Sequence, residues 1–153
     1  MKEFWSIEAD ERFTYGQRIE LGKLFADENA SDVAKFKGAF RIVYDYEVRA
    51  VEFKTLMPIF EQIANGLKYW LDAENAMLAS EPSADEIAAG CREYAEKVGE
   101  LGQIVSIAKD FSVLPNDLLK RPYSEIFGIM VADHERAKFE KRLNEQLTKK
   151  WRK

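Results

Sequence analysis

The sequence has very few of the side chains that most often carry out chemistry. Its 153 residues include one cysteine, Cys91, and one histidine, His134. One cysteine cannot form a disulfide within the chain or supply the ligands of a structural zinc site, and one histidine excludes a Glu-x-x-His site repeated on two helices. A Ser-His-Asp triad or a Cys-His pair would depend on His134 alone. We therefore predict a protein that is not an enzyme, with no catalytic, cofactor-binding or metal-binding residue and no cofactor.

The two residues themselves have structural explanations. His134 stands in the sequence Asp-His-Glu-Arg, which is typical of a helix surface. Cys91 falls on the apolar side of its segment, where a buried thiol behaves as a small apolar side chain. We expect His134 to be solvated or packed on a helix and Cys91 to lie in the core.

Long apolar runs are also missing. No stretch of about 18 uncharged apolar residues occurs, so we predict no transmembrane helix and no membrane partner. The first residues, MKEFWSIEADE, are acidic where a signal peptide would be basic and then apolar. We expect a cytoplasmic protein.

Glycine and proline are scarce, with eight and four residues. Neither GxGxxG nor GxxxxGK[ST] occurs, which argues against a phosphate-binding loop. No segment alternates apolar and polar residues with period two, which argues against strands. The chain is long enough for one core and short enough that a single domain is expected.

What the sequence does contain is helical periodicity, in which apolar residues recur every three or four positions. The segments with this pattern are 33–44, 56–78, 87–108 and 123–131. In the third segment the predicted core-facing line is Ile87, Cys91, Tyr94, Val98, Leu101, Val105 and Ala108. The patterns predict an all-α fold, a single-domain helical bundle of about five to six helices with a protruding basic C-terminal helix.

Several residues predict where helices begin. Thr14-x-x-Gln17 has the spacing of a capping box, and Ser31 and Ser83 are predicted N-caps. We expect the long helix to begin close to Pro58, because proline is tolerated in the first turn or at a kink. Whether 83–111 forms one helix or two is left open by its glycines.

Nineteen aromatic residues are present, and most fall on helical faces, which predicts that they lie in the core. Phe4 and Trp5 are exceptions because they precede the first predicted helix. We expect these two to plug the core of their own chain.

The net charge of −4 hides an uneven distribution. Residues 134–153 carry eight Lys or Arg against three Glu, whereas the preceding residues carry 15 cations and 24 acids. We therefore predict one domain over 1–153, with an acidic body over 1–131 and a basic helical arm over 132–153.

The arm has a thin apolar row with a spacing of four residues. We name this the α-row, and its members are Phe139, Leu143, Leu147 and Trp151. A row this thin among Lys and Arg indicates a helix that leaves the body. We predict that it binds a partner protein, because apolar anchors at i, i+4 spacing can lie in a groove. The alternatives are packing on a second copy, giving a homo-oligomer, or back on the body.

The segment AKDFSVLPNDLLKRP, residues 108–122, has a residue pattern typical of a helix-turn-helix. A DNA-reading motif places polar and cationic residues where they reach base edges, and here the candidates are Asn116, Lys120 and Arg121. The alternative function is therefore a nucleic-acid-binding module that uses 104–121 and the basic arm.

Two observations oppose that alternative. Asp117 lies among the candidate contacts, and the body is acidic, whereas affinity for duplex depends mainly on neutralised phosphates. We therefore do not expect nucleic acid as a partner. We prefer a structural corner between two helices, plugged by Leu118 and Leu119.

At this corner, residues 106–130 resemble small helical proteins of phage and prophage tail-gene clusters, including the tail assembly chaperones. In these proteins a proline-started turn with a leucine pair leads into a helix that opens with an aromatic residue. Residues 14–25 and 66–75 also resemble phage-associated sequences of Bacteroidales type. The resemblance implies a non-enzymatic protein of the bacterial host cytoplasm or the virion, with a tail or tape-measure protein as its partner. It assigns no binding residue and does not account for the basic arm.

Overall fold

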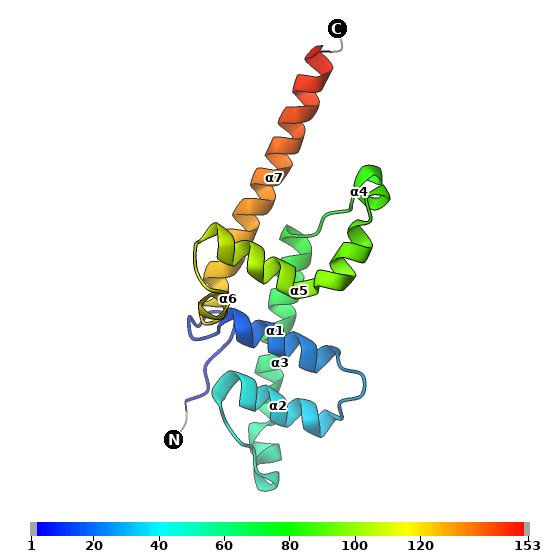
Figure 1. The fold of residues 1–153 in the computed structure, drawn as a ribbon. Helices are drawn as coiled ribbons and strands as arrows, with labels where there is room; N and C mark the ends of the chain where they lie inside the picture. The colour runs from blue at the N-terminus through cyan, green and yellow to red at the C-terminus, as the bar shows by residue number, and fades with distance from the viewer. Residues whose placement is uncertain (1–2, 152–153) are drawn as a thin grey trace.

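The computed structural model describes residues 3–151, which form seven α-helices and one short 3-10 helix (Figure 1). The elements are α1 Tyr15–Ala26, α2 Asp32–Tyr44, η1 Ala50–Glu52, α3 Phe53–Met77, α4 Ala84–Ala88, α5 Cys91–Asp110, α6 Pro115–Leu119 and α7 Tyr123–Trp151. The all-α prediction is confirmed. The helices outnumber the five to six expected, because 84–88 and 115–119 form short helices of their own. No helix among the described residues is long and apolar enough to cross a bilayer.

The predicted helix starts are confirmed at three N-caps. Thr14 and Gln17 form a reciprocal capping box at α1, and the Ser31 side chain accepts a hydrogen bond from the backbone of α2. Ser83 forms a second capping box with Glu86 at α4. Its backbone and side-chain hydrogen bonds hold the pKa of Glu86 below the ordinary value.

The predicted start of the long helix is wrong. α3 begins at Phe53, directly after η1, so Pro58 lies in its second turn instead of near its first residue. The reason is a local cap at the start of η1, which the prediction from Pro58 did not consider. The Glu52 carboxylate accepts hydrogen bonds from the backbone and the guanidinium of Arg49. This reciprocal contact starts the helical chain several residues before the proline.

The core lies mainly between α1, α2, α3 and the first turns of α7, and aromatic rings make up much of it. Phe36 of α2 stacks on Phe53 of α3 with ring centroids 4.8 Å apart, and it also contacts Phe40 and Phe60. Ile63 of α3 is completely buried. Val33 and Leu71, which the periodicity placed on these apolar faces, are exposed.

The segment before α1 packs on α3 at a glycine. The Trp70 indole donates a hydrogen bond to the Ile7 carbonyl at 3.0 Å. A Cβ atom on Gly66 would lie only 2.4 Å from the Ile7 side chain, so the close approach of the two segments requires glycine there.

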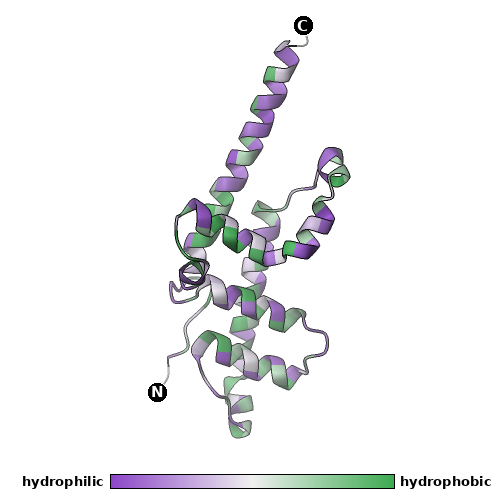
Figure 2. Cartoon of the chain, in the orientation of Figure 1, coloured by the Kyte–Doolittle hydropathy of each residue, from purple (hydrophilic) through white to green (hydrophobic). Residues whose placement is uncertain are grey.

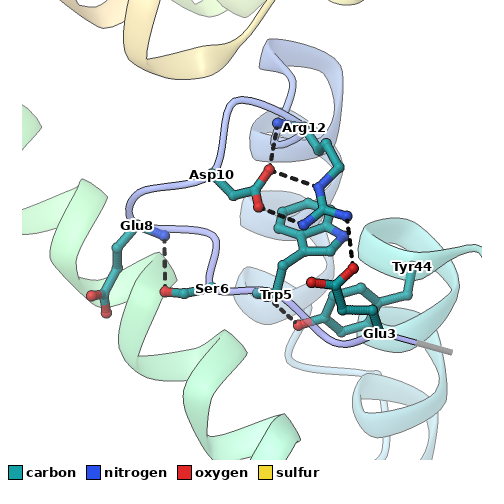
Figure 3. Close-up of polar contacts among 7 residues, drawn as sticks. All are labelled: Glu3, Trp5, Ser6, Glu8, Asp10, Arg12 and Tyr44. Atoms are coloured by element: carbon teal, nitrogen blue, oxygen red, sulfur yellow. Dashed lines mark hydrogen bonds and ion pairs between the residues drawn. The ribbon is translucent and has the colours of Figure 1, made fainter. Parts of the chain in front are cut away.

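The predicted aromatic plug is confirmed, since Phe4 and Trp5 pack edge-on against Tyr44. Figure 3 shows the polar contacts beside it: the Arg12 guanidinium pairs with Asp10 and lies 5.1 Å from the Trp5 ring. The Tyr44 hydroxyl donates to the Trp5 carbonyl at 2.7 Å. Hydrogen bonds from Arg12 lower the pKa of Asp10 to about 2.

The first turns of α7 are fixed to the body. The backbone amide of Tyr123 donates to the Phe13 carbonyl, and that of Tyr15 donates to the Arg121 carbonyl. Tyr123, Ile126 and Met130 are buried, and Met130 is the last buried side chain of the helix. Beyond it α7 projects away from the other helices, as the predicted protruding helix should (Figure 1).

Candidate protein-binding surface

The projecting part of α7 presents the predicted α-row to solvent. Every residue from Glu135 to Trp151 is exposed. The four α-row side chains are between 44 and 87 % exposed. Figure 2 shows short hydrophobic segments interrupting an otherwise hydrophilic helix. The row is therefore not packed back on the described body, which was one of the three expectations for it.

This end of α7 has little tertiary support, and two features explain its helical state. Continuing a helix that is already formed costs far less than nucleating a new one, and the Tyr123 end of α7 is anchored in the core. Ion pairs also link neighbouring turns, at 3.1 Å between Arg136 and Asp133 and at 2.9 Å between Lys138 and Glu135. Such exposed pairs contribute at most about 1 kcal/mol each.

A polar groove of about 830 Å³ runs between α7 and the chain at the start of α4. Glu81 and Glu86 line one wall, and Lys138, Lys141 and Lys149 line the other. Acidic and basic side chains thus face each other across it. No large apolar side chain of the described residues lines this groove.

The first half of the α-row points away from that groove. Lys141 and Glu145 line the groove, and Leu143 and Leu147 each follow one of them by two residues. Residues two apart lie on nearly opposite sides of a helix. Phe139 and Leu143 are therefore on the far side of α7 from α4, and the row turns toward the edge of the groove at Leu147 and Trp151.

A second set of exposed apolar side chains was predicted to be core. We name it the α4–α5 set, and its members are Ile87, Tyr94, Leu101 and Val105. They are between 44 and 66 % exposed, so their prediction as core residues is wrong. The residues of α5 that are buried are Ile104, Ile107 and Ala108. Cys91, also predicted to be buried, is partly exposed.

Two glycines explain the difference. Gly90 adopts a left-handed conformation with φ of 81° and separates α4 from α5, which shows that 83–111 contains two helices. Gly99 has φ of 51° and ψ of −141°, so α5 bends there. Each break rotates the face that follows, and a periodicity counted through both glycines therefore does not follow one buried side.

The predicted corner is confirmed as a packing element. Leu118 is almost completely buried, and Leu119 packs against the core. The approach to α1 is close, because a Cβ atom on Gly16 would lie 3.1 Å from the Leu119 carbonyl oxygen. Helix α6 is thus held on α1 by its leucine pair.

The candidate nucleic-acid residues of this corner are exposed: Asn116, Lys120 and Arg121. Lys120 lies 3.8 Å from an Asp117 oxygen, and Arg121 lies 3.1 Å from a Glu125 oxygen. Each cation is close to a carboxylate, which reduces the positive potential that a phosphate would meet.

A polar network not predicted from the sequence joins three helices at the base of α7. The Arg18 guanidinium of α1 forms two hydrogen bonds with the Glu74 carboxylate of α3, at 2.8 and 2.6 Å. The Tyr123 hydroxyl of α7 donates to the same carboxylate. These residues are 49 and 56 positions apart from Glu74, so no local motif could have revealed the network.

The tyrosines of this network are held in their protonated form. Burial raises the pKa of Tyr15 to about 12, and burial together with the Glu74 hydrogen bond also raises the pKa of Tyr123. The two rings stack with centroids 5.8 Å apart beside a cavity of about 310 Å³. Near neutral pH the hydroxyls can donate hydrogen bonds but cannot serve as bases, so the network acts as a clamp on α7.

His134 lies where α7 leaves the body, and its side chain is partly buried. Its Nε2 atom is buried and makes no hydrogen bond with a described residue. It lines a small cavity with Gln103, Ser106 and Asp133. Within residues 3–151, no group of three or more His, Cys, Asp or Glu side chains is placed to hold a metal ion.

Comparison with known proteins adds no further assignment: no family model, no curated protein and no solved structure matches the chain.

Proposed function

We propose that this chain is a non-enzymatic interaction protein that holds a partner protein through the α-row. The observation that carries the proposal is a row of four large apolar side chains, exposed on a helix that has no buried residue after Met130. Because these side chains make no core contacts, they contribute little to the stability of the fold. Their exposure therefore favours a role in binding.

The chemistry of the row favours a grooved, apolar partner with an acidic rim. Side chains at i, i+4 spacing form one ridge of a helix, which can insert between the side chains of a partner. At its two ends are Phe139 and Trp151, aromatic types that are enriched at interfaces, and Trp is among the types that most often dominate binding energy. Positive charge on the arm then favours acidic residues around the groove.

The remainder of the described chain supports a role without chemistry. The polar network of Arg18, Glu74 and Tyr123 uses its carboxylate and guanidinium to fix α7, and the Tyr123 hydroxyl stays protonated. The groove beside α7 is lined by solvated charges of both signs. We therefore propose no catalytic, cofactor or metal role for any residue.

We further propose that the partner is a phage or prophage tail protein, for example a tape-measure protein, and that the chain acts during tail assembly. This part depends on the sequence resemblance of residues 106–130. On the same ground we propose the cytoplasm of the bacterial host, or the virion, as its location.

The test is co-expression of the tagged full chain with the proteins encoded by the genes beside its own. The informative variant is Leu143→Glu with Leu147→Glu. The matched control, Asn144→Glu with Thr148→Glu, makes the same charge change at the same spacing on residues that line the groove.

We expect a neighbouring tail protein to co-purify with the unchanged chain and the control but not with the α-row variant. Truncation after Ala137 should leave a folded protein that also loses the partner. Equal recovery of the partner with both double variants would exclude the α-row as the binding surface.

A further inference from the structure

Two sets of exposed apolar side chains lie on elements of opposite charge. The α-row lies on the basic arm, where residues 134–153 carry eight cations and three acids. The α4–α5 set lies on 84–110, which carries six acids and three cations. Each set has four large side chains that no described part of the chain covers fully. Both surfaces therefore expose apolar side chains, and their net charges are opposite.

The projecting part of α7 is long compared with either part of α5. Helix α7 continues for about 20 residues after Val131, which is about 30 Å, whereas the 20 residues of α5 are divided by the bend at Gly99 into two shorter parts. Both lie on the same side of the body, with α4 beside the projecting part of α7 (Figure 1). An arm of this length is therefore more than long enough to cross one part of a facing α5, such as the part that carries Leu101 and Val105.

The two sets do not meet within one chain. The side of α7 that faces α4 is the polar groove with Lys141 and Glu145, and Leu143 is on the other side of the helix. For Leu143 to reach the α4–α5 set of its own chain, α7 would have to turn about its axis. Its first turns are fixed by Tyr123 and Ile126, which are buried.

We propose that the surface that covers the α-row is the α4–α5 set of a second copy of this chain. Two such contacts, each made by the arm of one copy on α5 of the other, close a symmetric dimer. The inference rests on the proposed function, because it assigns an occupant to the same row. A tail protein would then bind by displacing the second copy, which keeps the row covered until that partner arrives.

The charges favour this pairing over a contact between two arms. Two basic arms repel each other, whereas a basic arm and an acidic α5 attract. The row is also spaced by four residues throughout, and a two-stranded coiled coil needs an average of 3.5. The row therefore fits a ridge that crosses another helix better than a seam between parallel arms.

The first measurement is the mass of the full chain by sedimentation velocity over a range of protein and salt concentrations. We expect a dimer whose dissociation constant rises with salt, because added ions screen the attraction between arm and α5. Leu143→Glu with Leu147→Glu should raise that constant by about tenfold or more, as loss of central apolar anchors does. The control Asn144→Glu with Thr148→Glu should stay dimeric.

The second measurement is complementation. Leu101→Glu with Val105→Glu changes the receiving surface at the same i, i+4 spacing and should also give a monomer. Mixed with the α-row variant, it should form a dimer again at intermediate affinity. In that mixture the intact arm of one variant meets the intact α5 of the other. Circular dichroism checks the fold, and Leu101→Ser, which adds no charge, serves if the double variant unfolds.

The outcomes separate this inference from the proposed function. A chain that stays monomeric at every concentration, or a dimer that survives the Leu101 and Val105 changes, overturns the second-copy contact. If such a chain still loses its tail protein on Leu143→Glu with Leu147→Glu, the proposed function stands without it. Two monomeric variants that re-form a dimer only when mixed support the contact between arm and α5.

Discussion

The two ends of this molecule use the same sequence pattern with opposite results. In the lower part, α2 and α3 bury most of the apolar faces that their periodicity predicts, with Ile63 fully enclosed. In the upper part, α4, α5 and the end of α7 have apolar positions at helical spacing that remain exposed. A helical period identifies one side of a helix. It does not identify what covers that side.

The glycines show the difference in packing between the two parts. A Cβ atom on Gly66 would clash with Ile7 at 2.4 Å, and one on Gly38 would lie 2.7 Å from Leu24. A Cβ atom on Gly99 or Gly128 would meet nothing within 4 Å. Gly66 and Gly38 of the lower part are thus closely packed, so the stability of the fold should depend mainly on that part.

The largest expected effect contrasts one core residue with one α-row residue. Ile63→Ala should lower the free energy of unfolding by about 2–5 kcal/mol, because it removes buried methyl groups and leaves a cavity. Leu143→Ala should change it by less than about 0.5 kcal/mol, because the side chain is already exposed. Urea denaturation of the chain at a concentration where it is monomeric measures both. Similar losses for the two variants would place the α-row in the core.

A smaller effect is expected at the clamp on α7. Tyr123→Phe removes the hydroxyl that donates to the Glu74 carboxylate and should cost about 1–3 kcal/mol, the range for a hydrogen bond to a charged group. Tyr69→Phe is the control, because Tyr69 is exposed on α3. The same denaturation experiment applies. An unchanged midpoint for Tyr123→Phe would mean that the network does not hold α7.

Two glycine substitutions, one at the bend in α5 and one in α7, should change the free energy of unfolding in opposite directions. Gly99→Ala places a side chain at positive φ and should destabilise the fold by about 1–2 kcal/mol. Gly128→Ala, in the second turn of α7 with open space around it, should stabilise the fold by up to about 1 kcal/mol. Stabilisation by both changes would indicate that α5 is a straight helix.

The smallest expected effect is on the affinity of the chain for duplex DNA. Lys120→Ala with Arg121→Ala should change the affinity for random duplex by less than about twofold at low salt, because each cation lies close to a carboxylate. Fluorescence anisotropy at low and moderate salt measures it. A large loss of a salt-sensitive signal would favour the nucleic-acid alternative instead.

Features that depend on neighbouring residues in the sequence were predicted correctly, whereas features that depend on distant residues were not. The caps at Thr14, Ser31 and Ser83 depend on residues within a few positions of each other. The Arg18–Glu74 pair depends on how three helices are arranged, which no spacing along the chain records. The exposed α4–α5 set was missed because φ at a glycine, here Gly99, is not visible in the composition of the segment.

The most direct test of the account is the thiol reactivity of Leu147→Cys in a Cys91→Ser chain, with Thr148→Cys as the paired position. The account predicts that Leu147→Cys reacts freely in the dilute chain. Its reaction should then slow when the chain is concentrated or when the co-purifying tail protein is added, whereas Thr148→Cys keeps its rate. Equal rates for Leu147→Cys under all three conditions would contradict the assignment of the α-row as a binding surface.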